Sequence, residues 1–257
     1  MTMLKKGAAL ILCLCVLLSL AVAGAEGNPE LLYDFVLRHG DRNSPKIAIT
    51  VDDCYKNRRE WITYDADLCR KYGVKMTFFP LVINGCLEEQ YRDIWTDVVD
   101  SGCEIGTHTH THIKLGNRDH WAIIGSLGRA QEALDKTLGY HYEIRWLRPP
   151  YGSIADGKSL KKSQVIKAIK RYGFQNIIHW DVSETKDLEK ALKDVQNGSI
   201  LLFHAQKKDS LFLDKLIPEL QARGFEMVTV SELFGFDAPE TSDELYVYNK
   251  DDYRNKE

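Results

Sequence analysis

The stretch KIAITVDD, residues 46–53, decides the fold class of this chain. Its largely apolar, β-branched run over residues 47–51 is typical of a buried strand, and two aspartates follow it directly. Six further runs of the same kind come later in the sequence. We therefore expect seven strands, at residues 47–51, 75–80, 103–107, 144–147, 176–180, 199–203 and 227–230.

Longer amphipathic stretches separate these runs and are typical of helices. They cover residues 60–72, 88–101, 119–138, 159–172, 187–196 and 211–223. Five of them end just before a glycine, where a left-handed helix cap is common. Regular alternation of strand and helix predicts right-handed crossovers and a mostly parallel sheet. Seven such units in one domain favour an α/β barrel that is closed or nearly closed, with a doubly wound open sheet as the alternative.

The first 25 residues have the pattern of a secretory signal peptide. Lys5 and Lys6 precede an apolar run over residues 8–22, and small residues at 21–25 offer A-x-A cleavage sites. This pattern predicts a secreted or cell-envelope protein without stable membrane insertion after cleavage; an uncleaved anchor helix is the alternative. We expect an extension at residues 26–45, the main domain at 46–235, and a polar tail, surface-hugging or disordered, at 236–257.

The composition limits the class of protein. Of the 257 residues, 44% are hydrophobic and 28% are charged, which suits one globular domain of barrel or sandwich size, or two small ones. Loss of residues 1–25 leaves 32 basic residues against 37 acidic ones, a formal charge of −5. An acidic chain without a basic block argues against nucleic acid as a partner. We expect a monomer.

Polar and titratable side chains gather at the predicted strand ends, where parallel α/β barrels carry their catalytic groups. We expect these side chains to converge on one rim, although they are far apart in the sequence. They are Asp52 and Asp53 after the first strand, THTHTH at 107–112 after the third, RPPYG at 148–152 after the fourth, Trp180 and Asp181 after the fifth, and His204 after the sixth.

The THTHTH segment is the strongest sign of a metal site. In a strand, His108, His110 and His112 share one face, whereas in a helical turn only His108 and His112 meet. Either arrangement binds a metal through imidazole nitrogen; a polar surface tract is the alternative. Two histidines and one carboxylate leave coordination positions open, which suits a hydrolytic metal that holds water. The adjacent aspartates serve one site only if the chain turns there, and a solvated turn is the other interpretation.

The chain resembles the polysaccharide deacetylase family with the NodB homology domain, also called carbohydrate esterase family 4, over residues 46–234. The motifs that carry this likeness are TVDD at residues 50–53, HTHTH at 108–112, RPPYG at 148–152 and LLFH at 201–204. The resemblance implies a distorted barrel of about seven β/α units. It also implies a metal-dependent carbohydrate deacetylase whose partner is an acetylated glycan substrate.

The same resemblance assigns the metal ligands. It implies that Asp53, His108 and His112 hold a divalent metal, with zinc foremost and cobalt as the second choice. His110, between the two histidine ligands, is not implied to take part.

The resemblance also implies catalytic roles. Asp52 is the implied general base and His204 the implied general acid. Tyr151 is implied to offer its backbone N–H to the oxyanion, and Arg148 to fix the carboxylate network. The residues expected at the substrate are Leu201, in the wall of the acetyl pocket, Trp180, for which core packing is the alternative, and Pro150.

The fourth motif departs from the family pattern. Ser183 stands where the family carries an aspartate that supports the acid histidine. Asp181 lies two residues earlier and faces the same way on a strand, so we expect it to take over this role with a shifted reach. A capping or ion-pairing role for Asp181 is the alternative.

Four cysteines follow the predicted signal peptide, at positions 54, 69, 86 and 103. An even number in an exported chain permits two disulfides in three connectivities, and four buried free thiols are the alternative. Cys54 with Cys86 is the favoured pair, since the first two strands should end side by side. Cys69 with Cys103 would then tie the first helix to the end of the second.

The family resemblance, together with the signal-peptide pattern, implies removal of N-acetyl groups from peptidoglycan or a chitin-like N-acetylhexosamine polymer outside the membrane. The implied chemistry is metal-activated water with an aspartate base and a histidine acid. A hydrolase of the same fold that acts on another acetyl ester or amide, such as acetyl-xylan, is one alternative. A glycan-binding protein with impaired catalysis is the other.

Overall fold

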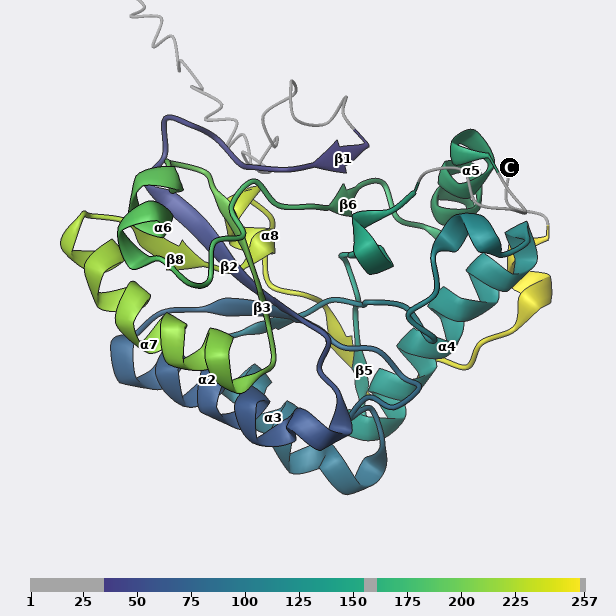
Figure 1. Ribbon diagram of the computed structural model, residues 1–257. Coiled ribbons are helices and arrows are strands. Elements are labelled where there is room, and N and C mark those ends of the chain that lie inside the picture. Colours follow the sequence, from purple (N-terminus) through teal and green to yellow (C-terminus); the bar gives the residue numbers. More distant parts are fainter. Residues whose placement is uncertain (1–34, 155–160, 255–257) are drawn as a thin grey trace, which may run out of the picture.

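The computed structural model describes residues 35–154 and 161–254, so the predicted signal peptide lies outside the described residues. Parallel strands run through the middle of this part of the chain and helices surround them (Figure 1). The expected α/β class with mostly parallel strands is thereby confirmed. No helix among the described residues has the length and apolar character needed to cross a membrane.

The central strand β2 is the stretch from which the fold class was predicted. Six of its seven residues are buried, because the sheet is covered on both faces. It pairs in parallel with β3 and β7, and β8 joins it at its first three residues. The strands are β1 (Val36–Leu37), β2 (Lys46–Asp52), β3 (Met76–Phe79), β4 (Glu104–Ile105), β5 (His141–Tyr142), β6 (Ile177–Ile178), β7 (Ile200–His204), β8 (Glu226–Val228) and β9 (Thr241–Ser242).

Backbone hydrogen bonds close the sheet into a ring. Beyond β4, Thr107 pairs in parallel with Leu147, whose carbonyl accepts the N–H of Ile178. Val182 then pairs in parallel with Leu201 of β7, which leads back to β2. The fold is therefore the expected distorted barrel.

The strand predicted at residues 144–147 is reduced to the single bridge at Leu147. On one side β5 turns away to pair with β9, antiparallel to it. On the other side the chain runs into Pro149 and Pro150, which have no backbone N–H to donate to a ladder. Strand pairing therefore cannot extend from Leu147 in either direction along the chain.

The helices form an outer layer in which neighbours contact one another in the order α6, α7, α2, α3, α4 and α5 (Figure 1). The predicted helices are all present with shifted ends. They are α2 (Arg59–Tyr72), α3 (Arg92–Asp100), α4 (His120–Leu138), α5 (Lys162–Tyr172), α6 (Leu188–Asp194), α7 (Lys207–Ala222) and α8 (Val230–Leu233), with the 3-10 turns η1 (Lys56–Arg58), η2 (Glu89–Tyr91), η3 (Leu115–Asn117), η4 (Pro150–Gly152) and η5 (Lys250–Tyr253).

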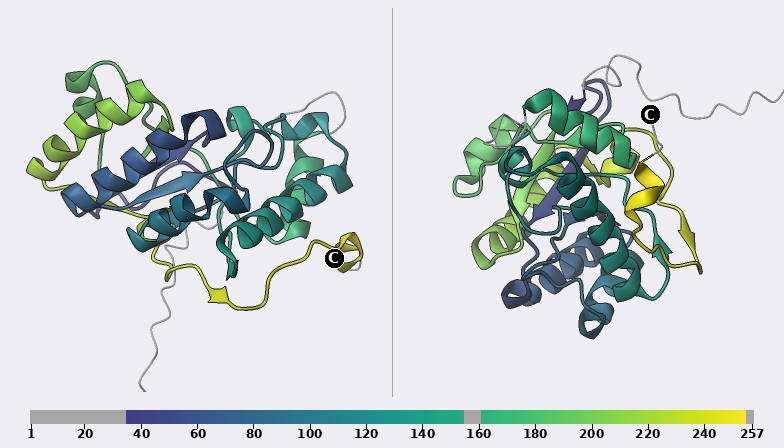
Figure 2. Two further views of the ribbon diagram at one scale, coloured as in Figure 1. Left: turned by 90° about the horizontal axis from the view of Figure 1, so that it is seen from below. Right: turned by 90° about the vertical axis from the view of Figure 1, so that its right-hand side faces the viewer.

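Residues 236–254 form a strap that crosses from the barrel to α4 and α5 (Figure 2). The ring of Tyr248 packs on Gly128 of α4, where an added Cβ would come within 2.1 Å of it, so only glycine fits there. Tyr253 is buried and stacks on Tyr172, with ring centroids 5.2 Å apart. Arg171 donates a hydrogen bond of 2.7 Å to the carbonyl of Tyr253. The strap is therefore packed into the domain.

Candidate metal and catalytic site

The carboxyl ends of the barrel strands bring Asp52, His108 and His204 to one rim. Asp52 is the last residue of β2, and the strand register pairs it with His204, the last residue of β7. The N–H of His108, just past β4, donates to the carbonyl of Pro80 at the end of β3. Residues from distant parts of the sequence thus meet at one rim, as the strand-end pattern predicted.

Asp53, His108 and His112 form a three-residue cluster whose potential ligand atoms all lie within 4.8 Å of one another. His112 Nε2 is 3.1 Å from Asp53 Oδ1, and His108 Nε2 is 3.7 Å from the same oxygen. Zinc binds nitrogen and oxygen ligands at about 2.0–2.2 Å, so ligand atoms around one ion are separated by roughly 3–4 Å. The spacing of this cluster fits one divalent ion.

The backbone of the histidine segment is neither the strand nor the helical turn that the spacing allowed. Thr109 and His112 have left-handed backbones, with φ of 74° and 52°. These two turns bring the rings of His108 and His112 to a centroid distance of 4.9 Å. His110 lies outside the cluster, and its N–H donates to Ser126 Oγ of α4. The i, i+4 meeting of His108 and His112 was therefore predicted correctly, but not its backbone.

Two buried atoms favour a cation in this cluster. His108 Nδ1 lies 2.7 Å from the carbonyl of Arg148, so its proton is there and Nε2 faces the cluster as an electron-pair donor. Burial lowers the pKa of His108 and favours the neutral ring that binds metal. Asp53 Oδ1 is buried, and its nearest neighbours in the cluster are the two imidazole nitrogens His112 Nε2 and His108 Nε2, which are themselves potential metal ligands. Two imidazoles and a carboxylate are an established donor set for zinc and similar ions.

Asp53 itself is held in a conformation suited to ligation. Its φ of 56° turns the chain directly after β2, so Asp52 and Asp53 face the same site although they are adjacent. Burial raises the pKa of Asp53, but contact with His112 and the charges of His108 and His204 outweigh burial and hold the pKa below its ordinary value. The carboxylate is ionised, as a ligand must be.

Arg148 occupies the middle of the strand ends and is completely buried. Its guanidinium donates to both oxygens of Asp52, at 3.2 and 3.3 Å, and to Thr50 Oγ1 at 3.1 Å. It also donates to the carbonyls of Ile178 and His179. Arg148 therefore fixes the Asp52 carboxylate while it ties three barrel segments together.

Tyr151 projects from the turn that follows Arg148. Its φ is 61°, its side chain is exposed, and its ring makes an edge contact of 4.7 Å with His112. Pro150 before it is buried, and the ring of Trp180 packs so closely on Gly152 after it that an added Cβ would come within 2.7 Å. The left-handed turn at Tyr151 is fixed from both sides and sits next to the cluster of Asp53, His108 and His112.

Comparison with known proteins identifies the family of this chain. Residues 39–177, more than half of the chain, match the family model described as Polysaccharide deacetylase. The chain belongs to the polysaccharide deacetylase family. The family membership predicted from the motifs is thereby confirmed.

Individual proteins that are similar to this chain have more specific names. A peptidoglycan-N-acetylglucosamine deacetylase of Bacillus cereus is 26% identical over 200 residues, which cover 76% of this chain and 70% of that protein. A bifunctional xylanase/deacetylase of Pseudobutyrivibrio xylanivorans is 27% identical over 200 residues, 75% of this chain but only 31% of that protein. One solved structure aligns with this chain with a TM-score of 0.65 at 25% sequence identity, over 80% of this chain and 95% of the other chain. It is a crystal structure of a peptidoglycan N-acetylglucosamine deacetylase in complex with 4-naphthalen-1-yl-N-oxidanyl-benzamide.

The departure from the polysaccharide deacetylase pattern at Ser183 has a structural counterpart that the sequence reasoning missed. Asp209, in the first turn of α7, accepts the backbone N–H of His204 at 2.9 Å, and its Oδ2 lies 3.4 Å from His204 Nδ1. Burial lowers the pKa of His204, but Asp209 and the nearby aspartates outweigh it and raise the pKa above its ordinary value. An acid placed five residues after the histidine, at a helix start, is the signal that could have found it.

Asp181 does not reach His204, which corrects the sequence prediction. It forms an ion pair of 2.7 Å with Arg42, and it accepts hydrogen bonds from Ser199 Oγ and from the N–H of Ile200. All of these partners lie toward the start of β7, whereas His204 ends that strand. The ion-pairing alternative for Asp181 is the one that the structure supports.

The wall of the site also differs from the prediction. Leu201 is completely buried in the hydrophobic core, because alternate residues of a strand face opposite ways and His204 faces the site. Leu202 shares the face of His204 and lines the hollow next to it. Trp180 is half-buried, and the guanidinium of Arg148 lies 5.3 Å from its ring centroid. One face of Trp180 is therefore already used for packing.

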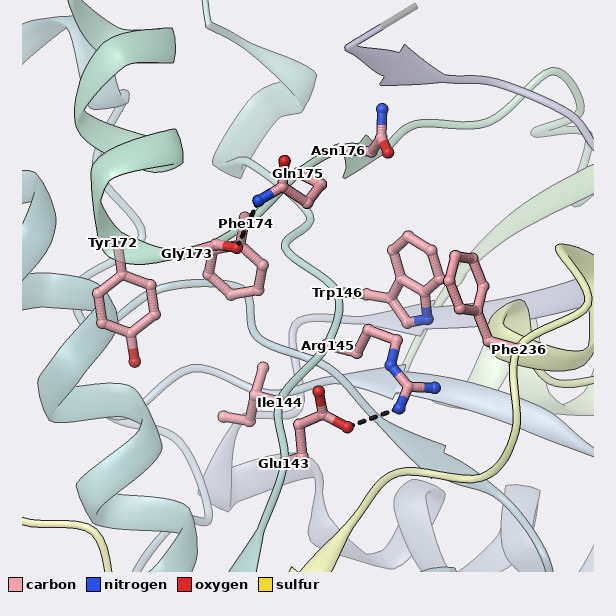
Figure 3. A pocket seen from close by; sticks show the side chains of 10 residues that line it. All are labelled: Glu143, Ile144, Arg145, Trp146, Tyr172, Gly173, Phe174, Gln175, Asn176 and Phe236. Carbon is pink, nitrogen blue, oxygen red and sulfur yellow. Dashed lines mark hydrogen bonds and ion pairs between the residues drawn. The ribbon is translucent and has the colours of Figure 1, made fainter. Parts of the chain in front are cut away.

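Two hollows differ in chemical character. The one beside the site, of about 320 Å³, is lined by Asp53, His204, Asp209 and Leu202, with Arg58 and Lys208 as cations. A second hollow, of about 350 Å³, lies at the opposite, amino ends of the barrel segments (Figure 3). There Trp146 and Phe236 lie side by side, and Arg145 points to Glu143 with an ion pair of 2.6 Å. None of the predicted site residues lines this second hollow.

Proposed function

We propose that this chain is a metal-dependent deacetylase that removes N-acetyl groups from a glycan outside the cell membrane. The observation that carries the proposal is the convergence of Asp53, His108 and His112 beside the Asp52–Arg148 pair and His204. The family membership supports the class of reaction. The extracellular location is proposed from the signal-peptide pattern and from relatives named for peptidoglycan.

The metal is proposed to be zinc, with cobalt as a substitute, held by Asp53, His108 and His112. A divalent ion supplies a Lewis acid that polarises an acetyl carbonyl and lowers the pKa of water. The chain's own contribution is to hold the three ligands in place before the ion arrives. The Arg148 carbonyl orients His108, and the turn at Asp53 aims its carboxylate inward.

Asp52 is proposed as the general base. Its carboxylate is buried at the strand end, and Arg148 holds it so that it can receive a proton from a water that attacks the acetyl carbon. The backbone N–H of Tyr151 is proposed to donate to the oxyanion that forms at the carbonyl oxygen. One such donor typically contributes about 3–4 kcal/mol to the lowering of the barrier.

His204 is proposed as the general acid. An amide nitrogen leaves poorly without a proton, so the ring must be charged when the C–N bond breaks. Asp209 keeps the ring oriented through Nδ1 and raises the pKa of His204, which favours the charged form. His204 then gives its Nε2 proton to the departing amine, and acetate and a free amino sugar result.

Peptidoglycan is the proposed substrate class, ahead of chitin. Arg58 and Lys208 place two positive charges at the hollow beside the site. Peptidoglycan carries carboxylates and chitin does not, so these cations favour an anionic glycan. The relative named xylanase/deacetylase keeps acetyl-xylan as a second candidate. Acetate release from peptidoglycan, chitin oligomers and acetyl-xylan, measured side by side, ranks the three.

The decisive test of the proposal is metal dependence of acetate release. We expect prolonged dialysis against a chelator to abolish release from peptidoglycan, and zinc or cobalt to restore it. His108→Ala should not be restored by either ion, whereas the matched variant His110→Ala should behave like the wild type. Acetate release that persists after chelation would disprove the proposal, and metal-dependent glycan binding without any release would point to the impaired glycan-binding alternative.

A further inference from the structure

Four cysteines of the described chain lie in two pairs, and no step of the proposed reaction uses them. All four are buried, and the structure holds them as free thiols. We propose that the exported protein carries two disulfides, Cys54–Cys86 and Cys69–Cys103, formed by exchange with an external disulfide. This proposal rests on the proposed export, since disulfides persist in oxidising compartments.

The pair Cys69 and Cys103 is almost in bonding position. Cys69 lies in the last turns of α2, and Cys103 comes directly before β4. Their sulfur atoms are 3.3 Å apart and both side chains are buried. A disulfide bond is about 2.0 Å long, so the sulfurs need to approach by only roughly 1.3 Å, which small changes of side-chain torsion provide. The two cysteines are therefore placed to form this bridge.

The pair Cys54 and Cys86 is placed by backbone pairing. Tyr55 and Gly85 form an antiparallel bridge, and the N–H of Lys56 donates to the carbonyl of Asn84 at 3.0 Å. This register sets the preceding residue Cys54 against the following residue Cys86. Opposed residues in antiparallel pairs have Cα atoms about 4.5–5.5 Å apart, within the range of about 4.4–6.8 Å that a disulfide spans. Both side chains are completely buried in the same core.

Only one of the three possible connectivities fits these positions. Cys69 contacts Cys103 on the side of β4, whereas Cys54 and Cys86 lie in the loops beyond the carboxyl ends of β2 and β3. The two bridges interleave in the sequence, so together they fasten β2, α2, β3 and β4 to one another. One half of the barrel would be cross-linked and the half from α5 onward would not.

The chemistry requires an external oxidant, which we assign to the class of exported thiol–disulfide oxidoreductases in their disulfide form. One cysteine thiolate attacks the external disulfide and forms a mixed disulfide; the second cysteine thiolate displaces the oxidoreductase. Two cysteine sulfurs are oxidised, two protons are released to solvent, and the external disulfide is reduced to its dithiolate pair, which is then reprotonated. Because the four thiols are buried in the folded protein, exchange takes place before folding is complete.

The bridge at Cys54 has a consequence for the metal site. Cys54 follows Asp53 directly, at the left-handed turn that aims this ligand inward. A bond from Cys54 to Cys86 fastens that turn to the loop after β3. The bridge therefore holds the ligand in place against the tendency of a non-glycine residue to leave a left-handed conformation.

The test is peptide mapping of the full chain, exported by a host with an oxidising periplasm and purified without reductant. The protein is alkylated in denaturant, digested without reduction and analysed by mass spectrometry. We expect peptides that join Cys54 to Cys86 and Cys69 to Cys103. Alkylation of all four cysteines, recovery of only one bridge, or any other pairing would overturn the proposal. Acetate release is measured on an untreated portion of the same sample and tests the proposed function separately. An active enzyme whose four cysteines are all alkylated in the mapping experiment would contradict the bridges but not the proposed function.

Matched variants measure the effect of each bridge. The variants Cys54→Ala/Cys86→Ala and Cys69→Ala/Cys103→Ala each keep one pair. We expect reductant to lower the thermal midpoint of the wild type by about 5–10 °C per bridge and to lower that of each double variant by about half of the wild-type shift. A wild-type midpoint that does not respond to reductant would contradict the proposal, whether or not the variants fold.

Discussion

Asp209 and His204 are joined twice, through the backbone N–H of His204 at 2.9 Å and through its ring nitrogen Nδ1 at 3.4 Å. The pair sits where β7 ends and α7 begins, so the strand places the ring and the helix start places the carboxylate. Asp209 is buried, while the His204 side chain is 36% exposed toward the hollow. The carboxylate next to His204 thus comes from the following helix, whereas the family pattern has its aspartate in the fourth motif.

Asp209→Asn is expected to impair amide hydrolysis more than ester hydrolysis. Loss of the carboxylate leaves the ring less oriented and less charged, so kcat for an N-acetyl substrate should fall roughly 10- to 100-fold. An aryl acetate ester, whose leaving group needs less protonation, should lose less than about threefold. Asp181→Asn is the matched control and should leave the ratio of the two rates unchanged. Equal losses on both substrates would show that Asp209 only supports the fold.

The pH dependence of the same variant tests the cause. The pKa of His204 is raised above its ordinary value of 6.5, against burial, by Asp209 and the nearby aspartates. A general acid must be protonated, so kcat/KM for the amide should fall as pH rises through this pKa. In Asp209→Asn the fall should move to lower pH. An unmoved alkaline limb would show that His204 is not the group that titrates.

The contribution of the His204–Asp209 pair to folding stability should also decrease as pH rises. The contribution of charged His204 is fully present below pH 6.5 and is lost as pH rises through the raised pKa. The pKa of Asp209 is lowered by His204 despite burial, so its own contribution is lost only as pH falls through that low value. Urea unfolding should therefore show a larger deficit for Asp209→Asn at pH 6 than at pH 9.

His112→Ala should remove metal binding, whereas His110→Ala should not. His112 Nε2 is the cluster atom nearest to Asp53 Oδ1, at 3.1 Å, while the N–H of His110 is bound to Ser126 on α4. Loss of a direct ligand should weaken zinc binding by more than the roughly 10- to 100-fold that outer contacts contribute. Competition titration against a chromogenic chelator measures both variants. Equal zinc affinities for the two would contradict the assignment of ligands.

Leu201→Ala and Leu202→Ala should separate stability from substrate fit. Leu201 is completely buried in the core, so its truncation should lower the free energy of unfolding by about 2–5 kcal/mol. Leu202 lines the hollow beside His204, so its truncation should alter KM and let a propionyl substrate react relatively better. Denaturant unfolding and paired acetyl and propionyl assays give the two readouts. If Leu201→Ala altered KM and Leu202→Ala altered only stability, the sequence prediction that Leu201 forms the wall of the acetyl pocket would be correct.

Arg148→Met should destabilise the protein far more than the loss of one surface ion pair. Arg148 is completely buried, and its removal leaves the Asp52 carboxylate buried without a counter-ion, at a cost of about 3–5 kcal/mol. The double variant Asp52→Asn/Arg148→Met removes both charges and should recover part of this loss. Urea unfolding of the two single variants and the double variant measures the coupling. Additive losses would show that the two side chains act independently.

The barrel was predicted well, because it depends on local pattern, and the three residues predicted as metal ligands lie close together in the structure. The apolar run at residues 47–51 and the alternation of strand and helix are sufficient for the parallel sheet. His108 and His112 were separated from His110 by spacing together with the family motif. The segment at 144–147 looked like its neighbours, but it forms only one bridge, because its pairing depends on the departure of β5 and on the two prolines that follow.

The support of His204 was not predicted, because it depends on contacts between elements. Asp181 was expected to reach His204, yet Arg42 and Ser199 come from elsewhere in the chain and take up its oxygens. Asp209 reaches His204 only because α7 starts within three residues of the strand end. An acid five residues after the histidine is a signal in the sequence, but the direction of the turn between β7 and α7 decides whether that acid lies next to the ring.

The strap over α4 and α5 determines when folding can finish. Tyr248 covers Gly128, and Tyr253 completes the stack on Tyr172, yet both belong to the last stretch of described chain. A polypeptide that leaves a ribosome or a translocation channel from its amino end must keep this helical surface uncovered until residue 253 has emerged. Products of interrupted synthesis would carry Asp53, His108 and His112 and still lack the cover on α4, which exposes them to proteases.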